Sequence, residues 1–151
     1  MDSRGSGRGV MLLPLQEDDI PKVLALWSEA GLPTKPGGRD TLENLTRRRR
    51  EAPDLFIGAF EGERMIGVVI GSDDGRKGWV NRLAVVPDRR RAGIAAKLLA
   101  RCEEALRSRG RRIICALIEK DNEASQRLVE GKGYRCEDRI AYYAKREADD
   151  V

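Results

Sequence analysis

Hydrophobic residues recur along the chain at spacings that predict helices alternating with strands. Apolar positions three or four residues apart predict a helix over residues 20–27, a second near residues 42–45 and a longer one from Ile94 to Leu106. A short fourth helix is expected over residues 123–130. Apolar runs bounded by turn residues predict strands over residues 10–13, 55–60, 65–70, 79–86, 113–118 and 140–144.

The order of these elements predicts an α/β (α+β) fold. The turns over residues 61–63 and 73–75 are short enough to join neighbouring strands into an antiparallel meander. A helix separates the strands over residues 79–86 and 113–118, and a strand–helix–strand unit favours parallel pairing with a right-handed connection. We therefore expect a mixed sheet of about six or seven strands, antiparallel in its first half and flanked by about four helices.

The length of the chain, 151 residues, suits one domain. We expect this domain over residues 10–146, between a disordered tail at 1–9, rich in Gly, Ser and Arg, and a short C-terminal tail at 147–151. No apolar run approaches the roughly 20 residues that cross a bilayer, and the first residues lack the apolar segment of a signal peptide. A cytoplasmic protein without membrane attachment is the expectation.

The absence of histidine removes several chemistries. Ser-His and Cys-His nucleophile pairs, His-ligated zinc and an imidazole general base are all excluded. The three cysteines, Cys102, Cys115 and Cys136, are odd in number and widely spaced, which indicates reduced thiols and no metal site. Any general base must therefore be a carboxylate, a tyrosine or a water molecule.

The net charge of +4 permits binding to nucleic acid, but an anionic cofactor explains the excess equally well. The arginine run over residues 47–50 falls on the predicted second helix, where a solvated face is the more common reason for such a run. Two Trp, three Tyr and two Phe are few for stacking on bases. Nucleic-acid binding is therefore a third alternative rather than the main hypothesis.

The most informative stretch is residues 83–95, where an apolar strand leads into a loop of basic and small residues. The loop opens a helix, and the first N–H groups of a helix have no intrahelical partner and carry partial positive charge. Gly93 and Ala95 allow close approach of a ligand, and the arginines at 89–91 supply charge. This arrangement predicts a pyrophosphate site.

Two motifs resemble those of the GNAT N-acetyltransferase superfamily. The spacing Arg90-x-x-Gly93-x-Ala95 resembles its acetyl-CoA motif, and the stretch from Asp121 to Ser125, followed by Gly133-Tyr134, resembles a second segment that begins at an Asn after the fifth strand. The resemblance covers residues 10–145 and is closest to the small bacterial YpeA-like acetyltransferases.

The resemblance implies acetyl-CoA as co-substrate, held in a sheet whose fourth and fifth strands splay apart. Backbone groups of the fourth strand would pair with the pantetheine arm, and the loop before the long helix would hold the pyrophosphate. Asn122 either bonds the pantetheine or caps the helix that follows it. The cofactor-binding residues expected on this basis are Leu83, Ala84, Val85, Arg90, Arg91, Ala92, Gly93, Ile94, Ala95, Asn122 and Ser125.

The catalytic acid and base are less clearly marked. Many relatives use a tyrosine as acid at a position where this chain has Val129, so Tyr142, Tyr143 or water takes that role. Asn81 occupies a position where relatives often carry Glu, and it could position a water molecule. Glu119 or Asp121 could accept a proton directly, but solvation at the surface or helix capping would also explain these residues. The candidates are Asn81, Glu119 and Tyr142. Tyr134 is expected in the core.

The expected reaction is direct acetyl transfer to a primary amine. At pH 7 roughly one α-amine in six is neutral, against fewer than one lysine in a thousand, so a site with a poor base favours protein or peptide α-amines. The acidic turn at Asp73 and Asp74 could attract a cationic acceptor. A lysine or small-molecule acetyltransferase is the alternative enzyme, and Val129 motivates a non-catalytic acyl-CoA sensor. Members of the superfamily are often dimeric, so a homodimer is possible.

Overall fold

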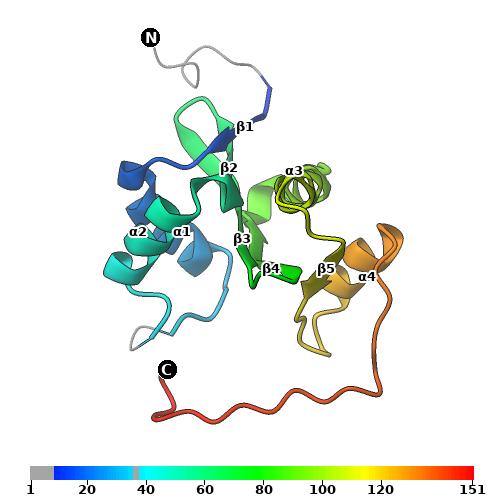
Figure 1. The fold of residues 1–151 in the computed structure, drawn as a ribbon. Helices are drawn as coiled ribbons and strands as arrows, with labels where there is room; N and C mark the ends of the chain where they lie inside the picture. The colour runs from blue at the N-terminus through cyan, green and yellow to red at the C-terminus, as the bar shows by residue number, and fades with distance from the viewer. Residues whose placement is uncertain (1–8, 36–37) are drawn as a thin grey trace.

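The computed structural model of the chain describes residues 9–35 and 38–151 (Figure 1). The tail expected over residues 1–9 lies outside these ranges apart from Gly9.

A mixed sheet forms the centre of the fold. Its strands lie in the order β1-β2-β3-β4-β5, with antiparallel pairing from β1 to β4 and parallel pairing of β4 with β5. The expected antiparallel first half and parallel crossover are confirmed. The bounds are β1 (Met11–Pro14), β2 (Phe56–Glu61), β3 (Arg64–Asp73), β4 (Lys77–Val85) and β5 (Ile113–Ala116).

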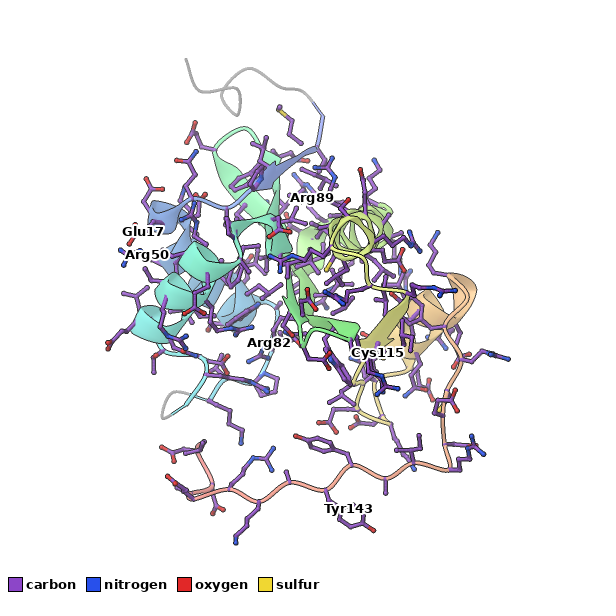
Figure 2. All side chains as sticks on the ribbon, viewed as in Figure 1. Glu17, Arg50, Arg82, Arg89, Cys115 and Tyr143 are labelled. Atoms are coloured by element: carbon purple, nitrogen blue, oxygen red, sulfur yellow. The ribbon has the colours of Figure 1, made fainter. Side chains whose placement is uncertain are left out.

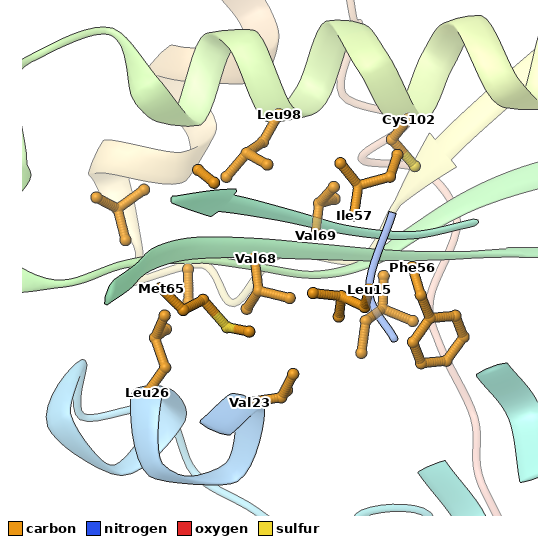
Figure 3. Close-up of a cluster of buried hydrophobic side chains, with 14 of the residues drawn as sticks. Leu15, Val23, Leu26, Phe56, Ile57, Met65, Val68, Val69, Leu98 and Cys102 are labelled. Atoms are coloured by element: carbon orange, nitrogen blue, oxygen red, sulfur yellow. The ribbon is translucent and has the colours of Figure 1, made fainter. Parts of the chain in front are cut away.

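Four α-helices in the described part of the chain flank the sheet, as expected. Their bounds are α1 (Ile20–Glu29), α2 (Leu42–Glu51), α3 (Ile94–Ser108) and α4 (Glu123–Gly131). Figure 3 shows α1 below the strands and α3 above them, with Val23 and Leu26 on one side and Leu98 and Cys102 on the other. The apolar stripes that predicted these helices are therefore the faces that they bury.

Glycines let α3 approach the sheet closely. A Cβ atom on Gly67 would lie 2.9 Å from Cδ1 of Leu98, and one on Gly71 would lie 2.8 Å from Sγ of Cys102. Larger residues would push the helix away at both positions. The N-terminus of α3 is thereby fixed against the end of β4.

The C-terminal part of the chain departs from the prediction. The sheet has five strands among the described residues, because the strand expected over residues 140–144 does not form and this stretch runs extended outside the sheet (Figure 1). The buried strand expected over 113–118 is also wrong in extent and burial: β5 ends at Ala116, and its residues are half-buried or exposed. No described strand covers its outer edge.

The start of α2 also differs. Thr41 is the N-cap residue, and its Oγ1 accepts a hydrogen bond of 3.0 Å from the Asn44 N–H. Asp40 and Glu43 have the spacing of a capping box, which predicts Asp40 as the cap, but Asp40 is buried and bonds elsewhere. The arginines of α2 make contacts within the chain, including a 2.8 Å hydrogen bond from Arg49 Nε to the Leu15 carbonyl.

Candidate functional site

The strands β4 and β5 separate partway along their length. Their pairing ends with Val80 opposite Ala116, and β4 continues for five further residues, of which the last four pair with β3 alone among the described strands. Leu83, Ala84 and Val85 lie in this stretch, and the last two are buried. The backbone N–H and C=O groups on the side of this stretch that faces away from β3 are therefore available to a ligand that forms hydrogen bonds as a neighbouring strand would.

A β-bulge lies at the point of separation. Ile70 of β3 pairs with Arg82, and Gly71 pairs with Val80, so Asn81 is the extra residue of β4. A bulge bends its strand and increases the local twist, which turns β4 away from β5. The Asn81 side chain is exposed, and its Nδ2 donates a 2.8 Å hydrogen bond to Ser72 Oγ.

The N-terminus of α3 faces this opening without a side-chain cap. Gly93 is the N-cap residue, with φ of 77°, and no atom lies within 4 Å of the position of a Cβ there. Glycine has no side chain that could accept from the first N–H groups of the helix, which leaves these groups open to an anion. Arg91 also has a positive φ, 67°, a conformation that strains a residue with a side chain and that clusters at functional sites.

The three arginines of the loop have different roles. Arg89 donates to both carboxylate oxygens of Glu61 at 2.8 to 3.1 Å and so ties the loop to β2. Arg90 donates to the carbonyl oxygens of Val85, at 3.3 Å, and Ala30, at 3.2 Å. The exposed Arg91 side chain has no hydrogen bond or ion pair within the described ranges, so it is the guanidinium most available to a phosphate.

Beyond β5, Asn122 caps α4. Its Oδ1 accepts a 3.2 Å hydrogen bond from the N–H of Ser125, which confirms the capping role among the two expected for this residue. Gln126 Nε2 donates to the carbonyl oxygens of Glu119 and Lys120 at 3.0 and 2.7 Å and fixes the turn before the helix. The Glu119 side chain is exposed.

The tyrosines lie away from this opening. Tyr142 is 68% exposed, on the C-terminal segment that runs extended outside the sheet (Figure 1). Tyr134 packs against the core, and its hydroxyl donates a 2.7 Å hydrogen bond to Glu103. Burial and this carboxylate raise the pKa of Tyr134. Val129 packs against the core.

A buried ion pair beside the bulge was not predicted from the sequence. Arg82 Nη2 lies 2.6 Å from Asp40 Oδ2, and the two side chains are 11% and 1% exposed. Arg82, labelled in Figure 2, also donates to the Pro33 carbonyl at 2.9 Å. Its guanidinium lies over the Trp27 ring, 4.6 Å from the centroid. The pair fixes the α1–α2 connection to β4. The partners are 42 residues apart, and no local pattern signals such a contact.

The acidic turn satisfies its carboxylates internally. Asp73 pairs with Arg111 at 2.8 Å and with Arg109 at 3.5 Å, and its carboxylate accepts from the Gly75 N–H. Hydrogen bonds from the Trp79 indole and from backbone N–H groups lower the pKa of Asp74 to about 2. The negative charge of these two carboxylates, which we expected to attract an acceptor amine, is therefore largely compensated by partners within the turn and on the neighbouring segment.

Clusters of metal-ligating side chains and membrane-spanning helices are both absent from the described residues. Within residues 9–35 and 38–151, no three His, Cys, Asp or Glu side chains come together as metal ligands would. In the same part of the chain, no helix is long and apolar enough to cross a membrane.

Comparison with known proteins places this geometry in context. The family model for the acetyltransferase (GNAT) family matches residues 20–134. An acetyltransferase of Sodalis glossinidius is 32% identical over 135 residues, which cover 89% of this chain and 94% of the relative. Another, from Photorhabdus laumondii, is 34% identical over 119 residues, covering 79% and 82%.

Solved structures share the fold. The PaiA N-acetyltransferase of Thermoplasma acidophilum, in complex with coenzyme A, has a TM-score of 0.75 at 19% identity, with 86% of this chain and 92% of that chain covered. The aminoglycoside acetyltransferase AAC(6')-Iy, in complex with a bisubstrate analogue, has the same TM-score and identity, with 91% and 99% covered.

Proposed function

Because the chain belongs to the acetyltransferase (GNAT) family, we propose that it transfers acetyl from acetyl-CoA to primary amines and prefers the α-amines of proteins or peptides. Acetyl-CoA-dependent transfer to an amine is the reaction of the family. The preference among amines is inferred from the side chains around the bulge of β4.

The residues of the opening fit acetyl-CoA. The uncapped N–H groups of α3, the open space beside Gly93 and the available Arg91 suit a pyrophosphate. The free edge of β4 over residues 83–85 suits the amide groups of a pantetheine arm. Acetyl-CoA supplies the thioester, and the neighbouring backbone N–H groups of β4 can donate to its carbonyl oxygen.

Direct transfer requires a neutral amine. The nitrogen attacks the thioester carbonyl carbon, a C–N bond forms, and the C–S bond breaks with its electron pair on sulfur. The amine loses one proton to solvent, and the thiolate is protonated to the thiol. A thiol of ordinary pKa, about 8.5, is a good leaving group near neutral pH, so no dedicated side-chain acid is needed.

The observation that carries the α-amine preference is Asn81. The bulge places this amide where the strands separate, and it bonds Ser72 Oγ. An amide cannot take a proton, and the exposed Glu119 lies beyond the end of β5. Without a strong base, the reaction depends on the neutral fraction of the acceptor, which at pH 7 is roughly 400 times larger for an α-amine than for lysine.

This preference predicts a pH profile. For a peptide with only an α-amine, kcat/KM should rise with pH and level off near pH 8, whereas for an Nα-blocked lysine peptide it should still be rising at pH 9. Steady-state release of CoA thiol measures both. Faster acetylation of the lysine peptide at pH 7, or a plateau for both peptides near pH 6, would contradict the proposal, because either result requires an efficient base.

A second candidate is acyl-CoA binding without transfer. The packing of Val129 against the core, where relatives have a tyrosine acid, favours it. It predicts stoichiometric acetyl-CoA binding with no thiol released in the presence of any amine.

A further inference from the structure

Apolar side chains gather on one face of the sheet where β4 and β5 begin. Side chains alternate between the two faces of a strand. A Cβ atom on Gly78 would lie 2.8 Å from Leu106 of α3, so Gly78 faces α3 and Trp79 points to the opposite face, on which α1 lies further along the sheet. Trp79 pairs with Cys115, and Ile113 shares that face of β5. We call Trp79, Ile113 and Cys115 the β4–β5 surface.

The β4–β5 surface is uncovered by the described part of the chain. Ile113 is 44% exposed, and Trp79 and Cys115 are half-buried. Figure 2 labels Cys115 on β5, next to β4. On the other face of β5, by contrast, Ile114 and Ala116 pack against the core. Apolar side chains that are grouped and uncovered beside a reaction site indicate contact with a ligand.

Hydrogen bonds hold the Trp79 indole in one orientation. Its Nε1 donates a 3.0 Å hydrogen bond to Asp74 Oδ2. The other oxygen of this carboxylate accepts from the N–H groups of Arg76 and Lys77, at 2.8 and 2.6 Å. The polar atom of the indole is therefore satisfied, and the apolar ring is what it offers to a ligand. A side chain that is fixed beforehand loses little conformational entropy on binding.

The β4–β5 surface begins beside the point of transfer. Asn81 bonds Ser72 Oγ, and Ser72 is the partner of Trp79 in the sheet, so the Asn81 and Trp79 side chains lie on the same face. Two residues along a strand span about 7 Å. This distance is about the reach of a long side chain from the α-amine of its own residue. An acceptor amine at Asn81 can therefore place its neighbouring side chain on the indole.

We infer that the β4–β5 surface binds the side chain of the first residue of the acceptor, and that the protein prefers peptides that begin with a large apolar residue such as Leu, Met or Phe. The inference rests on the proposed function, because in an α-amine acceptor a single carbon separates the reacting nitrogen from the side chain. By the same alternation Lys77 lies on this face, and its charge disfavours a first residue that is itself cationic.

Competition among three peptides tests the preference with the full chain. The peptides begin with Leu, Gly or Arg, are otherwise identical and contain no lysine. Equal amounts are incubated with the protein and limiting acetyl-CoA at pH 7, and mass spectrometry of the products gives the ratios of kcat/KM. We expect the wild type to acetylate the Leu peptide about 10-fold faster than the Gly peptide. The Arg peptide should react no faster than the Gly peptide.

Three variants identify the surface responsible. Trp79→Ala should bring the ratio of Leu to Gly peptide close to one. Trp79→Phe is the matched control, because it keeps an apolar ring without the bond to Asp74 and should retain most of the preference. Ile113→Glu adds a charge at an exposed position and should lower the rate for the Leu peptide while raising that for the Arg peptide, both relative to Gly. Partial unfolding lowers all three rates together and leaves the ratios unchanged.

Two results would overturn the inference and leave the proposed function standing. One is equal acetylation of the three peptides by the wild type. The other is a preference for the Leu peptide that persists in both Trp79→Ala and Ile113→Glu, because the side chain is then bound elsewhere. Acetylation of none of the peptides would overturn the proposed function and the inference together.

Discussion

An Asp40→Ala variant should lose about 3–5 kcal/mol of unfolding free energy, the largest stability loss that we expect from a single polar substitution. The change leaves the buried Arg82 guanidinium without its carboxylate, 2.6 Å away in the wild type, and removes the acceptor of the Lys35 N–H. A charge left buried and unpaired costs more than the pair contributes, because its lost hydration is no longer offset. Urea denaturation followed by circular dichroism measures the loss.

Two variants separate this effect from an ordinary loss of charge. Glu17→Ala breaks the exposed ion pair between Glu17 and Arg50 and should cost less than about 1 kcal/mol. The double variant Asp40→Leu with Arg82→Met removes both buried charges and should recover much of the loss. If Asp40→Ala costs no more than Glu17→Ala, the pair does not hold the α1–α2 connection as argued.

Gly93→Asp should weaken acetyl-CoA binding about 100-fold, since a carboxylate a few ångströms from a pyrophosphate costs about 2–4 kcal/mol in a partly solvated site. The space beside Gly93 is empty in the free protein, so the variant should fold. Asp and Asn tolerate a positive φ better than other residues with side chains, which makes Gly93→Asn the matched control of equal shape and strain.

Titration calorimetry with acetyl-CoA measures both Gly93 variants. We expect the acetyl-CoA affinity of the Asn variant to stay within about 10-fold of that of the wild type, because Asn adds no charge. Equal weakening by Asn and Asp would mean that shape rather than charge matters at this position. No weakening by either would place the pyrophosphate away from the N-terminus of α3.

Features that depend on local sequence could be predicted. The strand that leads into the loop, Gly93 before α3 and the apolar stripes of α1 and α3 each involve residues close together in the chain. The local sequence around Asn122 allowed two interpretations, and a helix cap was one of them. The opening between β4 and β5 followed from the family resemblance rather than from the residues themselves.

Features that depend on distant contacts could not be predicted. The bulge at Asn81 arises from the register between β3 and β4. The ion pair of Asp40 and Arg82 joins two segments that are distant in the sequence, and the pattern of hydrophobic positions does not indicate that they meet. Asp40 therefore looked like a helix cap. The strand expected over residues 140–144 has the right composition, but a strand also needs an edge to pair with, and in this chain the segment is directed away from β5.

Locating the transferred acetyl group tests the proposed reaction most directly. A peptide with one free α-amine and one lysine is incubated with the protein and acetyl-CoA at pH 7, and tandem mass spectrometry maps the product. We expect acetylation of the α-amine, with one thiol released for each acetyl transferred. Acetylation confined to lysine would contradict the acceptor preference, and saturable acetyl-CoA binding with no acetylated product from any amine would contradict catalysis.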